Sequence, residues 1–409
     1  MVFQPLLTVL ICLVLAYLLA ELFRRFNLPR VVGQLSAGLV LGILTVSYAL
    51  FTKEDLTILS FLADIGLILL FYYVGLETSI NAFKKNIKRS LMVSLFNTLL
   101  PFFLGFVILR YAFGFDLLAS LLIGVSLSVS AQSVSVDILE ELNKLKSKLG
   151  NTIVSIGAVD DIVELILVTL LLSVFHFKIS SLSLSRLLLD VFIFIIFIVV
   201  IKVWVLQYVL KFFDREHSST SRFTGSIVIV LIIAILSEFL GFGLLIGAMI
   251  AGIIVRQTIY KEVSIPNWEE HDIARSTHII AFGFLIPLFF VWVGLSVDLS
   301  LIAGNLLLIA VFIFIAFFGT IGGTIIAVMF SKGTLREGLV LGLGLNPKGD
   351  VELVIATLAL KASIIIPAVF TALVIMSLST TLISPIFFKR LVQKQPVQKN
   401  VSKGKLTAG

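Results

Sequence analysis

Long apolar runs separated by short polar segments repeat along the whole chain. Each run has the length of a membrane-spanning helix, about 17–25 residues, and lacks the alternation of outer-membrane strands. The pattern therefore predicts an all-α polytopic membrane protein with about thirteen transmembrane helices. The expected spans are 5–22, 31–50, 56–76, 90–113, 116–139, 150–175, 187–212, 223–240, 243–259, 276–296, 300–330, 335–360 and 364–388.

The composition excludes a soluble protein. Of the 409 residues, 59% are hydrophobic and 13% are charged, and a soluble fold of this length could not cover that much apolar surface. The single cysteine, Cys12, excludes an intrachain disulfide. The net charge of +7 lies in short loops between apolar runs, which indicates membrane topology. We therefore expect the lipid bilayer, and no nucleic acid, as a partner.

Basic residues are distributed unevenly between the two sides of the predicted helices. Of the 31 Lys and Arg residues, 24 fall on the side of Arg24 and 5 on the opposite side. Because positively charged loops stay in the cytoplasm, we expect the N-terminus outside the cell and the C-terminus inside. Residues 391–409 form a short basic tail that we expect to be disordered.

Two of the predicted helices carry polar interruptions. The first, at 124–139, contains five serines, and the second, at 342–353, contains Asn346, Pro347 and Gly349. Each lies at a similar distance into its half of the chain, which indicates two related halves. Paired interrupted helices are typical of transporters whose site lies between the repeats. The alternative is two helices that merely tolerate polar residues.

Adjacent carboxylates, Asp160 and Asp161, lie in the apolar run 153–175. An ionised acid at membrane depth costs about 3 kcal/mol, so such a pair is seldom accidental. Glu164 lies one helical turn further on, and three acids on one helical sector cannot all ionise in a low dielectric. Carboxylates bind hard cations and also protons, so the pair predicts competitive binding of a small cation or of a proton. A structural ion-pair cluster is the alternative.

Further candidate residues lie at or near the interruptions. Ser130 and Gln132, in the first interruption, are candidate ion or proton ligands together with the three acids. Lys348, in the second, either neutralises Asp350 beside it or balances an acid of the first half across the interface. Glu77 is another candidate for charge balance, although a plain interfacial position explains it without such a role.

Five motifs occur in an order that resembles the monovalent cation/proton antiporter-2 family, and within it the NapA-type sodium/proton antiporters. They are GQLSAGLVLG at 33–42, LLFYYVGLE at 69–77, VDD at 159–161, IPLFFVWVGLSVDL at 286–299 and NPKGDVELVIA at 346–356. The resemblance covers about residues 5–390.

This resemblance implies an inverted-repeat fold with two crossed broken helices, a homodimer and elevator-like alternating access. By motif position, Asp161 matches the essential ion-carrying aspartate and Asp160 the residue before it. The implied activity is exchange of Na⁺, or of Li⁺ or K⁺, for H⁺ in the plasma membrane of a prokaryote, for pH homeostasis and without a cofactor. The dimer-forming helices would be 5–50 and 187–259, and the transport core 56–175 and 276–388.

One departure from the family concerns a lysine. Members of this branch often carry a lysine in the helix before the second crossed one, and Thr320 or Gly319 stands there in the stretch FFGTIGG. Because a hydroxyl cannot exchange a proton as a lysine can, we expect electroneutral exchange. Glu164 and Lys348 are the groups that could take over the missing function.

Three other functions compete with this prediction. An organic-anion/sodium symporter on a similar fold would need a roomier and less acidic site. An intramembrane aspartyl protease needs two aspartates from different helices, whereas Asp160 and Asp161 are adjacent on one. A channel would need rings of repeated carbonyl groups, for which the sequence has no counterpart. We therefore predict a secondary antiporter, not an enzyme.

Overall fold

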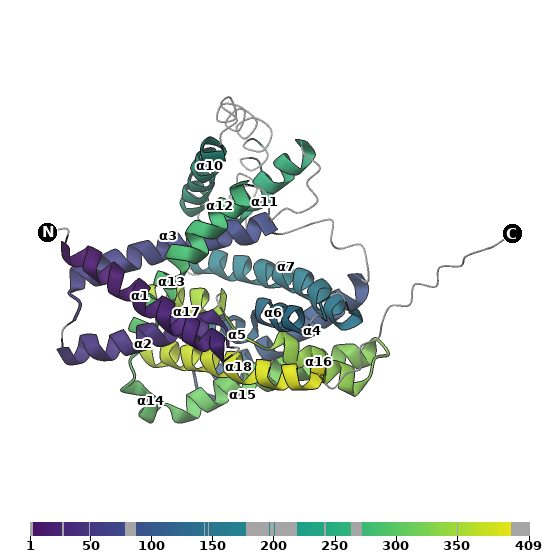
Figure 1. Cartoon of the computed structure of the whole chain (residues 1–409). Coiled ribbons are helices and arrows are strands. Elements are labelled where there is room, and N and C mark those ends of the chain that lie inside the picture. The colour runs from purple at the N-terminus through teal and green to yellow at the C-terminus, as the bar shows by residue number, and fades with distance from the viewer. Residues whose placement is uncertain are drawn as a thin grey trace. The chain divides into compact units, whose positions relative to one another are not determined.

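The structure is a computed structural model, and the part of the chain that it describes is helical (Figure 1). At some helical positions, Asp161 among them, the backbone is described and the side chain is not. The predicted helix at 187–212 lies almost entirely outside the described residues, as does the tail beyond residue 393. The described residues are 3–26, 28–48, 50–77, 87–142, 144–145, 147–176, 196, 200, 219–240, 243–262, 272–349 and 351–393.

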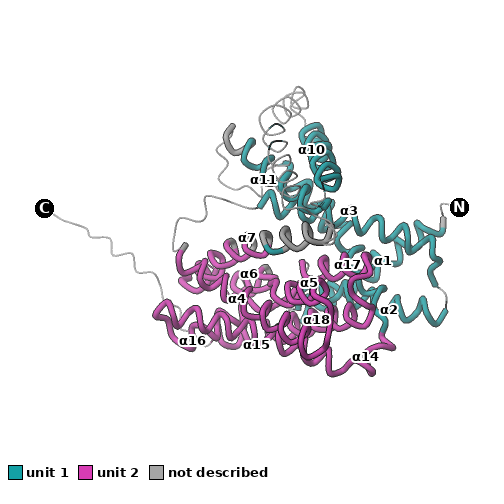
Figure 2. Tube along the Cα trace, turned by 180° about the vertical axis from the view of Figure 1, so that it is seen from behind, with its two compact units in different colours: residues 1–80, 165–298 teal, residues 81–164, 299–409 magenta. Residues whose placement is uncertain are grey.

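The chain folds into two compact units, each made from two separate stretches of sequence (Figure 2). Unit 1 contains residues 1–80 and 165–298, and unit 2 contains residues 81–164 and 299–409. Helix α7 (Lys148–His176) belongs to unit 2 as far as Glu164. Each unit thus combines a segment from the first half of the sequence with a segment from the second.

Unit 1 is a set of apolar helices that approach one another through glycines. A Cβ added at Gly38 would lie 2.2 Å from the carbonyl oxygen of Val291, and one at Gly75 would lie 2.1 Å from that of Met249. Small residues therefore let α2 contact α13 and let α3 contact α11, as is usual in membrane helices. The helices are α1 (Phe3–Arg25), α2 (Arg30–Tyr48), α3 (Lys53–Glu77), α10 (Ser219–Phe239), α11 (Leu244–Glu262), α12 (Asp272–Ile280), the π-helical turn η6 (Ala281–Leu285) and α13 (Ile286–Leu295).

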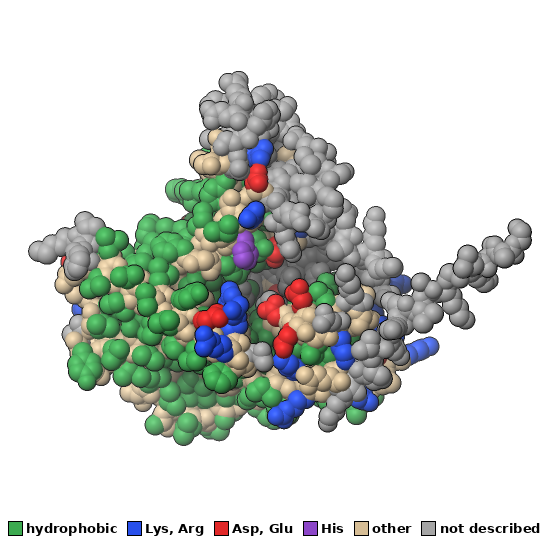
Figure 3. Space-filling model, viewed as in Figure 1, with side chains coloured by type: hydrophobic (Ala, Val, Ile, Leu, Met, Phe, Trp, Pro, Cys, Tyr) green, Lys and Arg blue, Asp and Glu red, His purple; other side chains and the backbone are tan. Residues whose placement is uncertain are grey.

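The surface of unit 1 includes broad apolar areas. On α1, the side chains of Leu6, Leu10 and Tyr17 are exposed. Figure 3 shows hydrophobic side chains covering most of the described surface over α1 and α2 on the face in view. Among the described residues, eight helices are long and apolar enough to cross a bilayer. The predicted class of all-α polytopic membrane protein is therefore confirmed, whereas the number of thirteen spans stays a prediction.

Unit 2 contains two groups of helices with the same order of a long helix, a broken helix and a second long helix. This repetition agrees with the two related halves expected from the sequence. The first group comprises α4 (Ile87–Val107) with the π-helical turn η2 (Ile108–Ala112), then α5 (Leu117–Ser128) and α6 (Ser133–Glu141), then α7. The second comprises α14 (Leu301–Gly304) and α15 (Leu306–Phe330), then α16 (Leu335–Leu345) and α17 (Val351–Lys361), then α18 (Pro367–Gln393).

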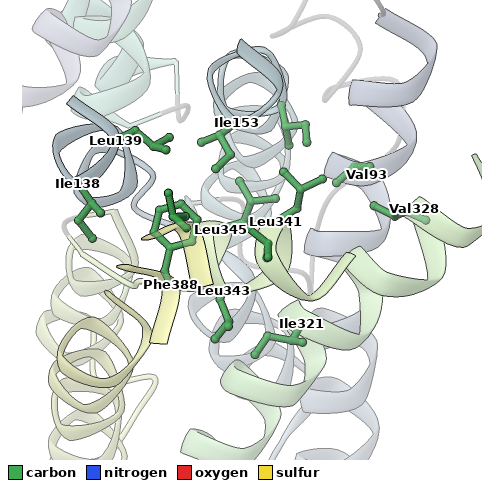
Figure 4. Close-up of a cluster of buried hydrophobic side chains, with 14 residues drawn as sticks. Val93, Ile138, Leu139, Ile153, Ile321, Val328, Leu341, Leu343, Leu345 and Phe388 are labelled. Carbon is green, nitrogen blue, oxygen red and sulfur yellow. The ribbon is translucent and has the colours of Figure 1, made fainter. Parts of the chain in front are cut away.

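An apolar core joins the broken helices of unit 2 to the long ones. Figure 4 shows Leu139 of α6, Ile153 of α7 and Leu345 of α16 together with Phe388 of α18. All four side chains are fully buried. In lipid, close van der Waals packing of this kind is a main source of helix association. The core therefore fixes the broken helices against their neighbours.

Both helix breaks fall within the predicted polar interruptions. The expected span 116–139 is divided into α5 and α6, and the expected span 335–360 into α16 and α17. The first break begins where Val129 turns to an extended conformation, with φ −61° and ψ 143°. The second contains Pro347, which cannot donate a backbone hydrogen bond and so ends α16. The predicted interruptions are confirmed as breaks in the helical backbone.

The predicted division into dimer-forming and transport-core helices stays a prediction. That division concerns assembly and movement, whereas the two units reflect packing within one chain. Helices α3 and α13, which we expected in the transport core, pack against each other and against α2 or α11 within unit 1. Compact packing and joint movement therefore need not follow the same boundaries.

Candidate ion-binding site

The two helix breaks contact each other inside unit 2. The backbone N–H of Ala131, in the first break, donates to the carbonyl oxygen of Pro347, in the second, over 2.7 Å. Gly349 permits this approach, because an added Cβ would lie 2.5 Å from the Cβ of Ala131. Backbone that leaves a helix inside a membrane must find such partners within the protein, and it is where ions can be coordinated. The contact between the breaks therefore marks the candidate site.

Side chains of neighbouring helices support the second break. The side-chain amide of Asn346 donates to the hydroxyl of Ser384, on α18, over 2.6 Å. The hydroxyl of Thr381, also on α18, donates to the carbonyl oxygen of Lys348. These hydrogen bonds pair the Asn346 side-chain N–H and the Lys348 carbonyl oxygen and hold the break against α18.

Asp160, on α7, is fully buried and accepts five hydrogen bonds. A carboxylate offers about four lone-pair positions, so these donors use its whole acceptor capacity. A cation or a proton that binds Asp160 must therefore replace at least one donor. Oδ1 accepts from Ser94 (2.8 Å) and Thr98 (3.1 Å), and Oδ2 accepts from Asn97 (3.0 Å), Ser130 (3.1 Å) and Gln132 (2.6 Å).

Glu164 lies one turn after Asp160 on α7 and shares a hydroxyl group with it. Its Oε1 accepts from the backbone N–H of Ser130 over 2.7 Å and lies 3.2 Å from Ser130 Oγ. That N–H is available because Ser130 lies in the first break, outside α5 and α6. Glu164 is buried. The structure thus brings together four of the predicted site residues: Asp160, Glu164, Ser130 and Gln132.

The ammonium group of Lys348 is fully buried and lies at the end of α5. Its Nζ donates to the carbonyl oxygen of Ser128, the last residue of α5, over 3.2 Å. It also donates to Thr320 Oγ1, on α15, over 3.3 Å. A positive charge at this position complements the negative C-terminal end of the α5 dipole. Lys348 therefore connects the second break to the end of the first half-helix.

Acids of both halves attract the Lys348 ammonium. These acids are Glu164 and Asp160 of the first half and Glu352 of the second. Glu352 is held by Ser377, whose hydroxyl donates to its Oε1 over 2.7 Å. Both roles predicted for Lys348 therefore stay predictions. Local neutralisation of Asp350 concerns a residue outside the described part of the chain.

Asn97, on α4, connects α15 to the site. Its Nδ2 donates to Asp160 and to Ser130 Oγ, and its Oδ1 accepts from Thr324, on α15, over 3.3 Å. The helices α4 and α15 can approach closely because Gly323 has no side chain. A Cβ there would lie 2.1 Å from the carbonyl oxygen of Phe96. Close helix packing therefore sets the position of the Asn97 amide.

Sequence reasoning missed the contribution of α4. Ser94, Asn97 and Thr98 all donate to Asp160, and none was among the predicted site residues. Their spacing of three and four residues places them on one helical face of an otherwise apolar segment. A polar stripe at this spacing was the signal that could have identified them.

Three predicted site residues are not tested by this geometry. Asp161 follows Asp160 on α7, but its side chain lies outside what the structure describes. Asp350 is outside the described residues altogether. Glu77 is the exposed last residue of α3, in unit 1, and its role in charge balance stays a prediction.

Comparisons with known proteins give a consistent family. Residues 9–394 match the sequence profile described as "Sodium/hydrogen exchanger, transmembrane". The chain is 30% identical to a Na(+)/H(+) antiporter of Enterococcus hirae over 376 residues, which are 92% of this chain and 94% of that protein. It is 27% identical to the Na(+)/H(+)-K(+) antiporter GerN of Bacillus cereus, over 91% of this chain and 92% of GerN.

The fold agrees with these sequence matches. The structure is similar to that of the sodium proton antiporter MjNhaP1 from Methanocaldococcus jannaschii, with a TM-score of 0.68 over 96% of this chain and 99% of that one. The sequence identity is 16%, so this likeness supports the fold alone. The sequence relatives are named as transporters, which confirms a transporter and not an intramembrane protease. The profile match and the Enterococcus hirae relative together show that the chain belongs to the sodium/hydrogen exchanger family.

Proposed function

We propose that this protein is a secondary antiporter that exchanges Na⁺ for H⁺, with the two ions competing for Asp160 and Asp161. The observation that carries the proposal is the setting of Asp160. It is a buried carboxylate that is saturated with donors and lies beside the contact between two helix breaks. An isolated structural acid would not need partners on α4 and in the first break at once.

The donors around Asp160 are suited to exchange one ligand for another. Hydroxyl and amide side chains carry both a hydrogen-bond donor and an acceptor oxygen. Ser94, Thr98 and Ser130 can donate to Asp160 when the site is empty, and can turn an oxygen toward a cation when it is filled. Because cation and proton both need the same carboxylate lone pairs, binding of one excludes the other. Such competition is sufficient to couple their movements.

The finer parts of the proposal rest on similarity and on the sequence. Na⁺ is the first candidate, and K⁺ or Li⁺ remain alternatives because the relative GerN is named as a Na(+)/H(+)-K(+) antiporter. The aspartate pair, Asp160 and Asp161, favours a NapA-type antiporter within the sodium/hydrogen exchanger family. A homodimer, elevator-like movement and a prokaryotic plasma membrane with the N-terminus outside complete the proposal.

Transport by purified protein tests this function. Proteoliposomes with an internal pH dye would be challenged in turn with Na⁺, Li⁺, K⁺ and choline. We expect proton movement with Na⁺ and none with choline, and loss of exchange in Asp161→Asn without loss of the folded state. Asp160→Asn should shift the pH profile of exchange. The N–H₂ group of the new amide would face side chains that donate hydrogen bonds to Asp160 and cannot accept from it in the same orientation. Asp116→Asn is the matched control, since either residue can cap the N-terminus of α5.

Two outcomes would contradict the proposal. Wild-type exchange by Asp161→Asn would exclude its carboxylate as the carrier. Uptake of an organic anion with Na⁺, and no proton movement with any cation, would favour the symporter alternative. No contact among the described residues favours that alternative, because the groups that meet at the breaks include buried acids.

A further inference from the structure

One side chain lies between the two buried acids of α7. The hydroxyl oxygen of Ser130 is 3.1 Å from Asp160 Oδ2 and 3.2 Å from Glu164 Oε1. A hydroxyl carries one hydrogen, so it can donate to only one of these carboxyl groups at a time. It can accept a hydrogen bond from the other if that group is protonated. Ser130 is therefore placed to connect the two acids.

The neighbours of Ser130 keep this arrangement in place whichever acid it donates to. The Asn97 amide donates to Ser130 Oγ over 3.1 Å, which leaves one lone pair free to receive a proton. The backbone N–H of Ser130 donates to Glu164 over 2.7 Å and does not depend on the direction of the hydroxyl. Glu164 therefore keeps its position while the hydroxyl hydrogen turns toward one acid or the other.

We propose that Ser130 relays a proton between Asp160 and Glu164 during cation/proton exchange, an inference that rests on the proposed function. When protonated Asp160 is the source, its O–H bond breaks and the proton joins Ser130 Oγ. At the same time the original Ser130 hydrogen leaves for Glu164 Oε1. One proton has then moved from Asp160 to Glu164, and Ser130 is neutral before and after the step.

Charges around the two acids give this relay a direction. A cation that binds beside Asp160 stabilises the ionised form of that carboxylate and so drives the proton toward Glu164. The Lys348 ammonium, in the same cluster, favours the ionised form of both acids. When the cation leaves, its bias toward ionised Asp160 is removed and the proton can return to that carboxylate. Among the described groups, Lys348 and Glu352 are the other charged side chains in this electrostatic cluster, and α4 contributes the uncharged Ser94, Asn97 and Thr98.

The test compares Ser130→Ala with Ser130→Thr, which keeps the hydroxyl. Ser126→Ala is the matched control, because Ser126 is a buried serine of α5, the half-helix that precedes the break, and takes no part in the contacts of Asp160 and Glu164 described above. The rate of Na⁺-driven proton movement would be measured in proteoliposomes, and Na⁺ affinity by equilibrium binding of radiolabelled Na⁺. We expect the alanine variant to bind Na⁺ but to exchange about a hundredfold more slowly, as for loss of a positioned proton-transfer group. The threonine variant should recover most of the rate.

Infrared difference spectroscopy gives a readout that does not need turnover. On addition of Na⁺ to the wild type at constant pH, we expect the carboxylic-acid signal of Glu164 to increase. This signal is assigned to Glu164 if it is absent in Glu164→Gln. In Ser130→Ala this increase should be lost. If the alanine variant does not fold, Glu164→Gln serves instead in the transport test, because its amide oxygen can still accept from the Ser130 N–H.

Three results would overturn the relay, and they differ from failure of the proposed function. A wild-type exchange rate in Ser130→Ala would exclude the relay through Ser130. A parallel loss of Na⁺ binding and exchange would show that Ser130 is only a cation ligand. An unchanged Na⁺-induced infrared signal of Glu164 in Ser130→Ala would show that the proton takes another route. If the wild type moves no protons with any cation, the proposed function itself is wrong.

Discussion

The ammonium nitrogen of Lys348 lies 3.3 Å from the hydroxyl oxygen of Thr320. Position 320 is where the family resemblance leads one to expect a lysine. The α15 helix lacks that lysine, yet a positive charge reaches the same place from the second helix break. Whether this ammonium balances the charge of Glu164 and Asp160 stays a prediction, which the Lys348 variant below tests.

We predict that exchange is electroneutral. Thr320 offers a hydroxyl that does not gain and lose a proton as an amine can, so one cation should displace one proton from the carboxylates. Transport would be measured in vesicles under potassium diffusion potentials set with valinomycin, for cations other than K⁺. We expect the steady-state pH gradient to be the same at inside-negative and inside-positive potentials. Opposite changes at the two potentials would show that Lys348 or Glu164 also exchanges a proton in each cycle.

Replacement of Lys348 should destabilise unit 2 and lower exchange. Lys348→Ala leaves Glu164, Glu352 and Asp160 without the positive charge that attracts them, and removal of one partner from a buried charge cluster costs about 3–5 kcal/mol. Thermal unfolding of the purified protein measures the loss. Lys361→Ala, at the exposed end of α17, is the control and should have little effect. If both variants unfold at the wild-type temperature, the Lys348 ammonium is dispensable for stability.

Gly323→Ala should disturb the site through the backbone of α4. The new Cβ would lie 2.1 Å from the carbonyl oxygen of Phe96, so α4 must move away and take Asn97 with it. Gly322→Ala is the matched control, because its nearest neighbour, an atom of the Leu100 side chain, would be 3.6 Å away. We expect a lower melting temperature and weaker Na⁺ binding for the first variant only. Equal behaviour of the two variants would contradict the close packing of α4 and α15.

Gly157→Ala should weaken the hydrogen bond between Gln132 and Asp160. An added Cβ would lie 2.2 Å from Gln132 Oε1, so the flexible amide must turn away and lose its 2.6 Å contact with Asp160. A hydrogen bond to a charged group contributes about 1.5–3 kcal/mol, and the upper end of this range limits the free energy that the variant can lose at Asp160. Na⁺ affinity and the pH profile of exchange would be compared with those of Gly304→Ala, whose Cβ meets no atom within 4 Å. Wild-type affinity in Gly157→Ala would show that Gln132 is not needed to position Asp160.

The sequence alone determined the class of the protein and the location of its helix breaks. Apolar runs of spanning length leave no alternative to membrane helices, because the backbone must be satisfied within each segment. Proline at 347 removes a backbone donor, and clustered serines compete for backbone hydrogen bonds, so both breaks can be located without coordinates. Asp160 and Glu164 could be placed on one helical sector because their separation is local in sequence.

Only the tertiary structure decided what those acids contact. The periodicity of α4 places Ser94, Asn97 and Thr98 on one face, but periodicity does not say which helix that face meets. The contact of Lys348 with the Ser128 carbonyl oxygen depends on the approach of the second break to the end of α5, between residues far apart in the sequence. That approach is set by glycine-dependent packing and by backbone contacts between the breaks. Local pattern therefore fixes where polar groups occur, and long-range packing fixes which of them meet.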